Sequence, residues 1–95
     1  MKREKCESLI QDREKRKEID QHLVELIAER QFYADQALRF KKSVQDIQSP
    51  ERVEQVLLKV RDLATEQDLD PVLVEKIYRE MIQHFIQREL KEFRP

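Results

Sequence analysis

Three basic side chains occupy positions where a long helix should bury apolar residues. From Ile19 onward, core-type positions recur at alternating spacings of four and three, at Ile19, Leu23, Leu26, Arg30, Tyr33, Ala37, Phe40 and Val44. Arg30 interrupts this stripe and Lys41 lies beside it, while Arg13 and Arg16 fall on its backward extension. A cation on a core face is costly unless an anion or several acceptors meet it. The pattern therefore predicts a helical pocket for an anionic ligand.

The spacing of these cations suggests how they could hold a ligand. Arg30 and Lys41 are eleven residues apart, so on one continuous helix they share nearly one azimuth and are separated by about 16 Å of axis. Two long side chains that lean toward each other can hold a small molecule. Arg13 lies about 25 Å from Arg30 along such a helix, so it cannot reach the same pocket within its own chain, but an antiparallel partner helix could deliver it. The alternative is that all three are surface cations with buried stems.

Two acidic residues are further candidates. Tyr78, Ile82, Phe85 and Glu89 recur at helical spacing, which predicts a carboxyl group on an apolar face. Desolvation favours the protonated form of such a group, which can then donate a hydrogen bond. Alternatively, Glu89 lies at the edge of the stripe and points to solvent. Glu51 is ambiguous, because an acid in the first turn of a helix is explained by the helix dipole alone.

Other reactive residue types form no recognisable site. His22, His84 and Cys6 are too far apart in the sequence for a typical zinc site. Neither a Ser-His-Asp grouping nor a phosphate-binding loop is present. The residues therefore predict neither covalent catalysis nor a metal centre.

The composition excludes several classes of protein. The 95 residues allow a single domain, residues 1–95, and their 19 basic and 20 acidic residues leave a net charge of −1. This balance gives no support for nonspecific binding to nucleic acid or to an anionic membrane. No apolar run is long enough to span a membrane, and residues 1–17 are too charged for a secretory signal. Cys6 cannot form an internal disulfide, which fits a cytoplasmic location.

The sequence predicts an all-α protein with three helices. It contains neither Gly nor Asn, the residues that most readily form tight turns, and it is rich in good helix formers. The first helix is predicted from about Glu4 to about Ser43, followed by a polar connection at residues 44–49. The second should start at Ser49 as N-cap with Pro50 and end near Asp68. The third should start at Asp70 as N-cap with Pro71 and run to Phe93.

The first helix is too long for one chain to cover. Forty residues make a rod of about 60 Å, whereas a compact domain of this length has a radius of gyration of only about 13 Å. Its apolar stripe must then be buried by another chain, which predicts a dimer. A plain coiled coil is the alternative on periodicity alone.

Several of these residues have the spacing of a known enzyme family, and the match covers almost the whole chain. They resemble the all-α chorismate mutase family, the intertwined homodimeric type, at Arg13, Asp20, residues 26–30 and Lys41 in the first helix, Glu51 in the second and Glu89 in the third. Each feature alone is common, but their joint spacing is fairly specific.

The resemblance implies a cofactor-free isomerase that rearranges chorismate to prephenate in two equivalent sites of a homodimer. By this resemblance, Arg30 would bind one carboxylate of the substrate and Arg13 of the other subunit would bind the second. Lys41 and protonated Glu89 would donate to the ether oxygen, and Glu51 would accept from the ring hydroxyl. Neither nucleic acid nor a membrane is an expected partner.

Some positions differ from many mutases. Pro50 stands where they have an Arg before the acid, and the segments 39–41 and 50–53 look more like the isochorismate pyruvate lyase branch, which releases pyruvate and leaves salicylate. That branch has Gln where this chain has Glu89, an acid also found in some mutases. We therefore favour the mutase and keep the lyase as the alternative.

A non-catalytic helical dimerisation module is the second alternative. Arg16, at a position usually apolar in the family, is expected to pair with a neighbouring acid.

Overall fold

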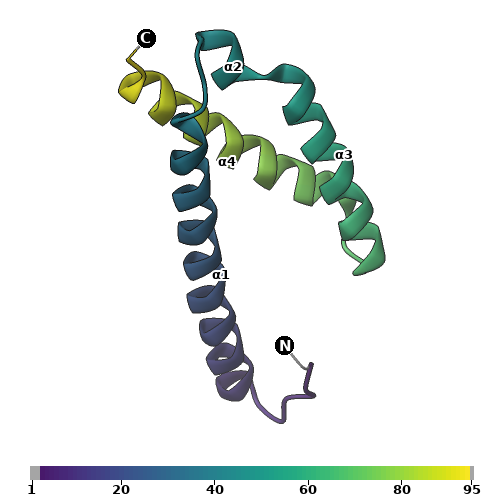
Figure 1. The fold of residues 1–95 in the computed structure, drawn as a ribbon. Helices are drawn as coiled ribbons and strands as arrows, with labels where there is room; N and C mark the ends of the chain where they lie inside the picture. The colour runs from purple at the N-terminus through teal and green to yellow at the C-terminus, as the bar shows by residue number, and fades with distance from the viewer. Residues whose placement is uncertain (1–2, 95) are drawn as a thin grey trace. The chain divides into compact units, whose positions relative to one another are not determined.

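The computed structural model describes residues 3–94, and every regular element in this range is an α-helix. The helices are α1 (Leu9–Leu38), α2 (Val44–Gln48), α3 (Pro50–Glu66) and α4 (Pro71–Glu92) (Figure 1). The all-α prediction and the three long helices are confirmed. The segment 44–49, expected to be a simple connection, instead contains the short helix α2.

The described residues form two compact units that divide between Tyr33 and Ala34. In the first unit, residues 3–33, the predicted apolar stripe is not covered. Leu23, Leu26 and Tyr33 are 53%, 60% and 70% exposed, and no residue of α1 is buried. We call these three residues the exposed apolar face of α1. A helix of this composition gains little from folding unless another surface covers that face.

The second unit, residues 34–94, contains the hydrophobic core. Figure 1 shows α3 and α4 side by side, and both α2 and α3 pack against α4. Ile47 of α2, Leu57 of α3, and Ile82 and Ile86 of α4 form the buried cluster. The partly buried side chains of Leu38, Val53, Val56, Tyr78, Leu90 and Phe93 surround it. Burial of these side chains fixes α2 and α3 on α4.

The starts of α1 and α2 use the same hydrogen-bonding pattern. The Gln11 N–H donates to Ser8 Oγ at 3.1 Å, and the Gln11 side chain accepts from the Glu7 N–H at 2.7 Å. At α2, Asp46 N–H donates to Ser43 Oγ at 3.1 Å and the Asp46 carboxylate accepts from Lys42 N–H at 2.9 Å. Each serine thus satisfies an N–H group that the first helical turn leaves open, and the side chain three positions later accepts from the residue before the serine, in a variant of the capping box. The first helix therefore starts at Leu9, and its predicted start at Glu4 is wrong.

The C-terminal end of α1 also differs from the prediction. Its last residue is Leu38, not Ser43. The N–H groups of Arg39, Phe40 and Lys41 bond to carbonyls only three residues back, at 3.2, 3.0 and 3.1 Å. These tight turns narrow the helix and stop it. The chain then continues to the Ser43 cap, so Lys41 lies between two helices.

Among residues 3–94, two non-glycine residues take the left-handed conformation that glycine usually supplies. Asp68 has φ 58° and follows α3 in a Schellman motif, in which Leu69 N–H bonds to the Ala64 carbonyl at 2.9 Å. Ser49 has φ 31° and precedes Pro50, the first residue of α3. Asp tolerates this conformation better than most residues. The chain therefore makes sharp helix connections without any Gly.

The predicted helix starts at residues 49 and 70 are found, but only one has the expected cap. Asp70 Oδ1 accepts from Val72 N–H at 2.9 Å, with Pro71 at the first helical position, as predicted. The Ser49 side chain makes no cap bond to α3. Its hydroxyl donates instead to the Asp46 carbonyl of α2. The predicted capping role of the Ser49 side chain is therefore wrong.

The Ser43 cap provides a test of how α2 is held. Ser43→Ala removes the acceptor of the Asp46 N–H, and we expect it to lower the free energy of unfolding by about 1 kcal/mol. Ser43→Thr retains a hydroxyl and should recover most of the loss. The measurement is urea unfolding at one fixed protein concentration, since self-association would add to the apparent stability. Equal destabilisation by both variants would contradict the proposed cap.

Candidate active site

A lysine and a glutamate meet at the edge of the core of the second unit. Lys41 Nζ donates to Glu89 Oε2 at 2.8 Å. Glu89 is only 4% exposed, and the Lys41 side chain is 25% exposed. An ammonium and a carboxylate at this distance form a charge-assisted hydrogen bond in surroundings largely shielded from water. The pair is therefore a polar site built into an apolar region.

The α4 sequence places Glu89 in the core. Ile82, Phe85, Ile86 and Glu89 are the buried residues of α4 and follow one another at three- and four-residue intervals, which is a single helix face. The prediction that the Glu89 carboxyl group lies on the apolar face is confirmed. Since a buried carboxylate needs a partner, the position of Lys41 is coupled to this face.

Lys41 reaches Glu89 from a turn rather than from a helix. The prediction that Arg30 and Lys41 lie on one continuous helix with a shared azimuth is wrong, because α1 ends at Leu38. Leu38 packs against the core cluster of the second unit. The tight turns at residues 39–41 follow α1, and from there the Lys41 side chain reaches Glu89.

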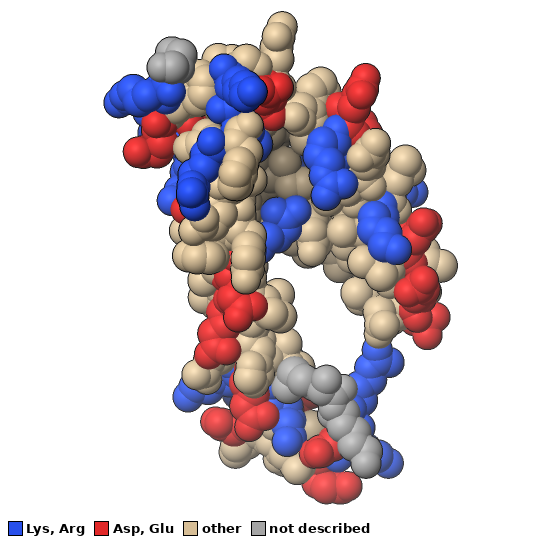
Figure 2. Space-filling view, viewed as in Figure 1, with Lys and Arg blue, Asp and Glu red and all other residues tan. Residues whose placement is uncertain are grey.

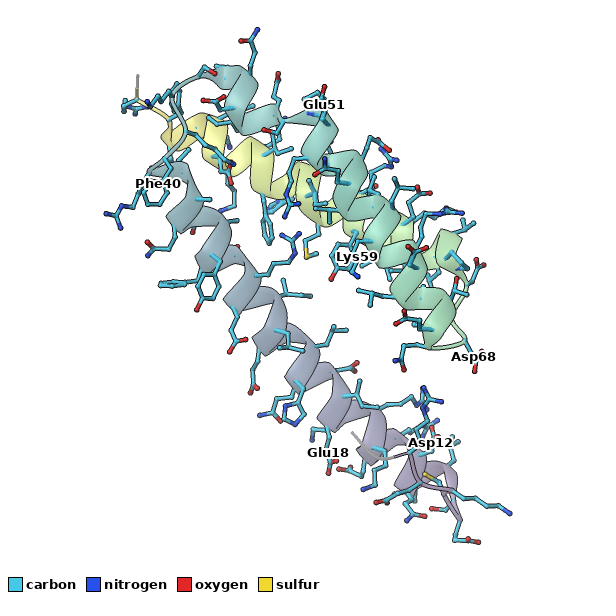
Figure 3. The ribbon with its side chains drawn as sticks, turned by 45° about the vertical axis from the view of Figure 1, so that its right-hand side comes forward. Asp12, Glu18, Phe40, Glu51, Lys59 and Asp68 are labelled. Atoms are coloured by element: carbon cyan, nitrogen blue, oxygen red, sulfur yellow. The ribbon has the colours of Figure 1, made fainter. Side chains whose placement is uncertain are left out.

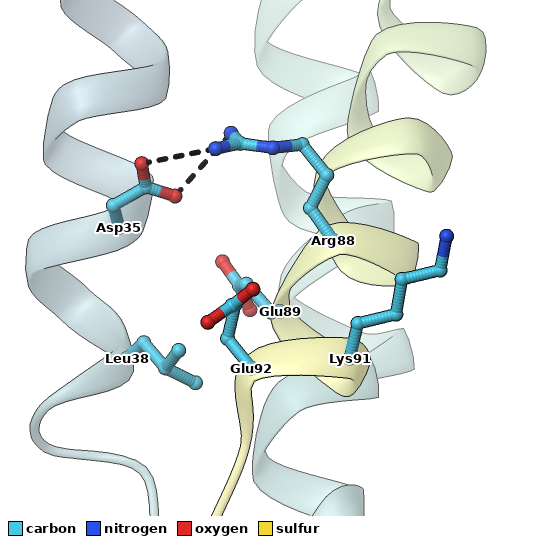
Figure 4. Close-up of a pocket in the computed structure, with 6 residues that line it drawn as sticks. All are labelled: Asp35, Leu38, Arg88, Glu89, Lys91 and Glu92. Carbon is cyan, nitrogen blue, oxygen red and sulfur yellow. Dashed lines mark hydrogen bonds and ion pairs between the residues drawn. The ribbon is translucent and has the colours of Figure 1, made fainter.

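Two neighbouring cavities adjoin the pair. The first has a volume of about 420 Å³ and is lined by Asp35, Leu38, Arg88, Glu89, Lys91 and Glu92 (Figure 4). The second, of about 330 Å³, is lined by Asp35, Leu38, Arg39, Lys41, Glu92, Phe93 and Arg94. Asp35, Leu38 and Glu92 line both cavities. The volumes are within the range of sites for small organic molecules.

Glu51 lies elsewhere on the second unit. It is exposed at the second position of α3 (Figure 3). It lines a shallow depression of about 350 Å³ with Ser49, Pro50, Arg52 and Gln55. This depression shares no lining residue with the two cavities beside Lys41 and Glu89. The structure therefore does not group Glu51 with the buried pair.

The remaining candidate residues belong to the first unit. Arg13 is exposed and Arg30 is half-buried. Arg16 Nε donates to Asp12 Oδ1 at 2.7 Å, so the expectation that Arg16 pairs with a neighbouring acid is confirmed. Lys41 and Glu89 are candidate residues that the structure brings into direct contact.

The surface charge is mixed. Figure 2 shows Lys and Arg interspersed with Asp and Glu on the face drawn, without one dominant basic patch. None of the described helices is both long enough and apolar enough to cross a membrane. Residues 3–94 contain no group of three or more His, Cys, Asp or Glu side chains that could hold a metal ion.

Comparison with known proteins identifies the family. Residues 12–90 match the family described as chorismate mutase type II. The chain belongs to this family. It is also 34% identical over 91 residues to isochorismate pyruvate lyase of Pseudomonas aeruginosa, a match that covers 96% of this chain and 90% of that protein. Membership in the chorismate mutase type II family agrees with the all-helical fold and supports an enzyme.

The sequence analysis did not predict two features of the structure, the Asp35–Arg88 ion pair and the Ser43–Asp46 helix start. Asp35 and Arg88 form an ion pair, although they are 53 residues apart and carry no local signal of contact. Ser43 and Asp46 did carry a signal, because Ser followed three residues later by an acid is typical of a helix start. That signal marks the end of the segment 39–43, which joins α1 to α2 and contains Lys41.

The energetic coupling of Lys41 and Glu89 can be measured with a double-mutant cycle. Lys41→Gln and Glu89→Gln should each lower the free energy of unfolding by about 1–3 kcal/mol, because each leaves a partner poorly satisfied. The double variant should lose less than the sum, by about 1–2 kcal/mol. Arg61 and Glu75 form a more exposed pair at 3.3 Å and provide the control, with coupling below about 1 kcal/mol. Additive effects at Lys41 and Glu89 would contradict energetic coupling of the pair.

Proposed function

We propose that the chain is a chorismate mutase, which rearranges chorismate to prephenate without a cofactor. The observation that carries the proposal is the buried contact between Lys41 and Glu89, with two small cavities beside it. Membership in the chorismate mutase type II family supports it. The reaction is a unimolecular Claisen rearrangement, so it requires neither a nucleophile nor a proton transfer.

Catalysis would consist of holding a compact conformer and stabilising charge that develops on the ether oxygen. Lys41 is suited to this task because an ammonium group has three N–H donors. It can keep its bond to Glu89 and donate a second hydrogen bond to the ether oxygen. Glu89 accepts from Lys41 in the free chain. In the proposed complex, protonated Glu89 would donate from its other oxygen to the same ether oxygen.

The two carboxylates of the substrate need further cations. We assign one carboxylate to Arg30 and the other to Arg13 of the partner subunit. Guanidinium groups bind carboxylates in a bidentate manner, which fixes orientation as well as charge. Glu51 would accept a hydrogen bond from the ring hydroxyl. Each active site would then combine residues of both chains.

A homodimer with two shared sites is part of the proposal. The exposed apolar face of α1, Leu23, Leu26 and Tyr33, is the observation that supports it. Exposed apolar surfaces of this kind are typical of protein interfaces. A second copy of the chain would cover this face in an isologous contact and form two equivalent sites.

The second candidate function is an isochorismate pyruvate lyase. It is favoured by the relative from Pseudomonas aeruginosa, which carries that name and matches this chain almost from end to end. The segments 39–41 and 50–53 also look like that branch, and the same cations would hold isochorismate. We favour the mutase because an acid, Glu89, occupies the position where the lyase branch has Gln.

The first experiment assays both substrates with the purified chain and no added cofactor. We expect chorismate to be consumed faster than isochorismate. Lys41→Ala should lower kcat/KM by about 10²–10³, as expected for a donor to developing charge, and Arg30→Ala by about 10². Lys59→Ala, an exposed lysine of α3, is the control and should retain full activity. Circular dichroism checks that each variant is folded.

The outcomes of this assay separate the three candidate functions. Faster release of pyruvate from isochorismate would identify the lyase. No turnover of either substrate would contradict both enzymes and favour the helical dimerisation module.

The second experiment tests shared sites by mixing two inactive variants. In a dimer of Arg13→Ala and Lys41→Ala chains, one of the two sites contains neither substitution. We expect random chain exchange to restore about one quarter of wild-type activity, since about half of the dimers are mixed and each has one intact site. Mass spectrometry of the mixture verifies exchange. Confirmed exchange without any recovery would count against Arg13 acting across the dimer.

A further inference from the structure

A second ion pair lies next to the Lys41–Glu89 pair. Both terminal nitrogens of Arg88 donate to the Asp35 carboxylate, Nη1 to Oδ1 and Nη2 to Oδ2, each at 3.4 Å (Figure 4). Asp35 lies in the last turn of α1, and Arg88 immediately precedes Glu89 on α4. Both residues belong to the second unit and line the cavity that also contains Glu89.

The location of this ion pair matters because Lys41 lies outside any helix, so few local contacts fix its position. Lys41 follows α1 by three residues, in tight turns closed by three backbone hydrogen bonds. Whether its ammonium reaches Glu89 therefore depends on how the end of α1 is fixed to α4. Leu38 supplies an apolar contact there, but an apolar contact constrains distance more than rotation.

A two-point contact supplies the missing constraint. Two parallel N–H···O bonds define a plane, so the guanidinium and carboxylate groups restrict rotation of the α1 end relative to α4. We propose that Asp35 and Arg88 are positioning residues that hold the turn after α1 so that Lys41 stays at Glu89. This inference rests on the proposed function, in which Lys41 donates to the ether oxygen.

The pair is poorly suited to a purely stabilising role. The side chains of Arg88 and Asp35 are 38% and 49% exposed, and pairs with this exposure contribute little to global stability. Its effect should therefore appear as local order near Lys41. A variant that loses the pair should remain folded, which makes the proposal testable.

The experiment compares Arg88→Gln with Arg61→Gln. The Arg61–Glu75 contact is a matched control because it also joins α4 to a neighbouring helix, at 3.3 Å, with side chains 40% and 29% exposed. Arg88→Gln should lower kcat about fivefold on the better substrate, with KM changed less than about twofold, because Lys41 would act mainly in the transition state. Arg61→Gln should leave both constants unchanged.

Charge reversal provides the rescue. Asp35→Arg and Arg88→Asp should each lower kcat, and the double variant should restore it to within about twofold of wild type. Recovery would show that the contact between the two side chains, and not either side chain alone, sustains kcat. If Arg88→Gln and Asp35→Asn both retain wild-type kcat while the Lys41 variant is inactive, the positioning role is overturned and the proposed function stands.

Hydrogen exchange provides a readout that does not depend on activity. Amide exchange at Arg39, Phe40 and Lys41 should rise about twofold to fivefold in Arg88→Gln and stay unchanged in Arg61→Gln. If the wild type turns over neither substrate but this exchange pattern is found, the proposed function fails and the positioning of the turn is supported. Unchanged exchange at these three amides in Arg88→Gln would overturn the inference.

Discussion

A carboxyl group buried in the core of a small helical unit must have a partner, and most of the arrangement around Glu89 follows from this requirement. Lys41 meets Glu89 at 2.8 Å, and the turn that carries Lys41 ties the end of α1 to α4. In proteins generally, an apolar pair of similar volume often stabilises a core as well as a buried ion pair does. The pair is therefore better explained by what it can do than by the stability it adds. Two small cavities adjoin the pair, one lined by Glu89 and the other by Lys41.

The exposed apolar face of α1 sets a second constraint, because Leu23, Leu26 and Tyr33 remain largely in contact with solvent. Arg13 and Arg30 lie on this same helix, whereas Lys41 and Glu89 lie in the other unit. A second copy that covers the face would bring further cations to the site as well as stability. Under the proposed dimer, substrate binding and burial of the exposed apolar face would depend on the same interface.

The sequence predicted burial best where the side chains of one helix face repeat at regular spacing. The spacing from Tyr78 to Glu89 predicted the burial of Glu89, and Asp70 with Pro71 predicted the start of α4. It was least informative at helix ends, where the good helix formers at residues 39–43 continue the helical pattern but the Ser43 cap starts a new helix. The Asp35–Arg88 contact joins residues 53 positions apart, so local periodicity could not predict it.

The contact between Lys41 and Glu89 also bears on how one site could serve two related reactions. In the free chain Glu89 accepts a hydrogen bond from the Lys41 ammonium. A carboxyl group can donate a hydrogen bond only when it is protonated, whereas a Gln amide at the same position always carries two donors. Under the proposed function, the acid and the amide would therefore differ in what they can offer the ether oxygen of the substrate. The identity of this one side chain would then help to decide which of the two related reactions the site favours.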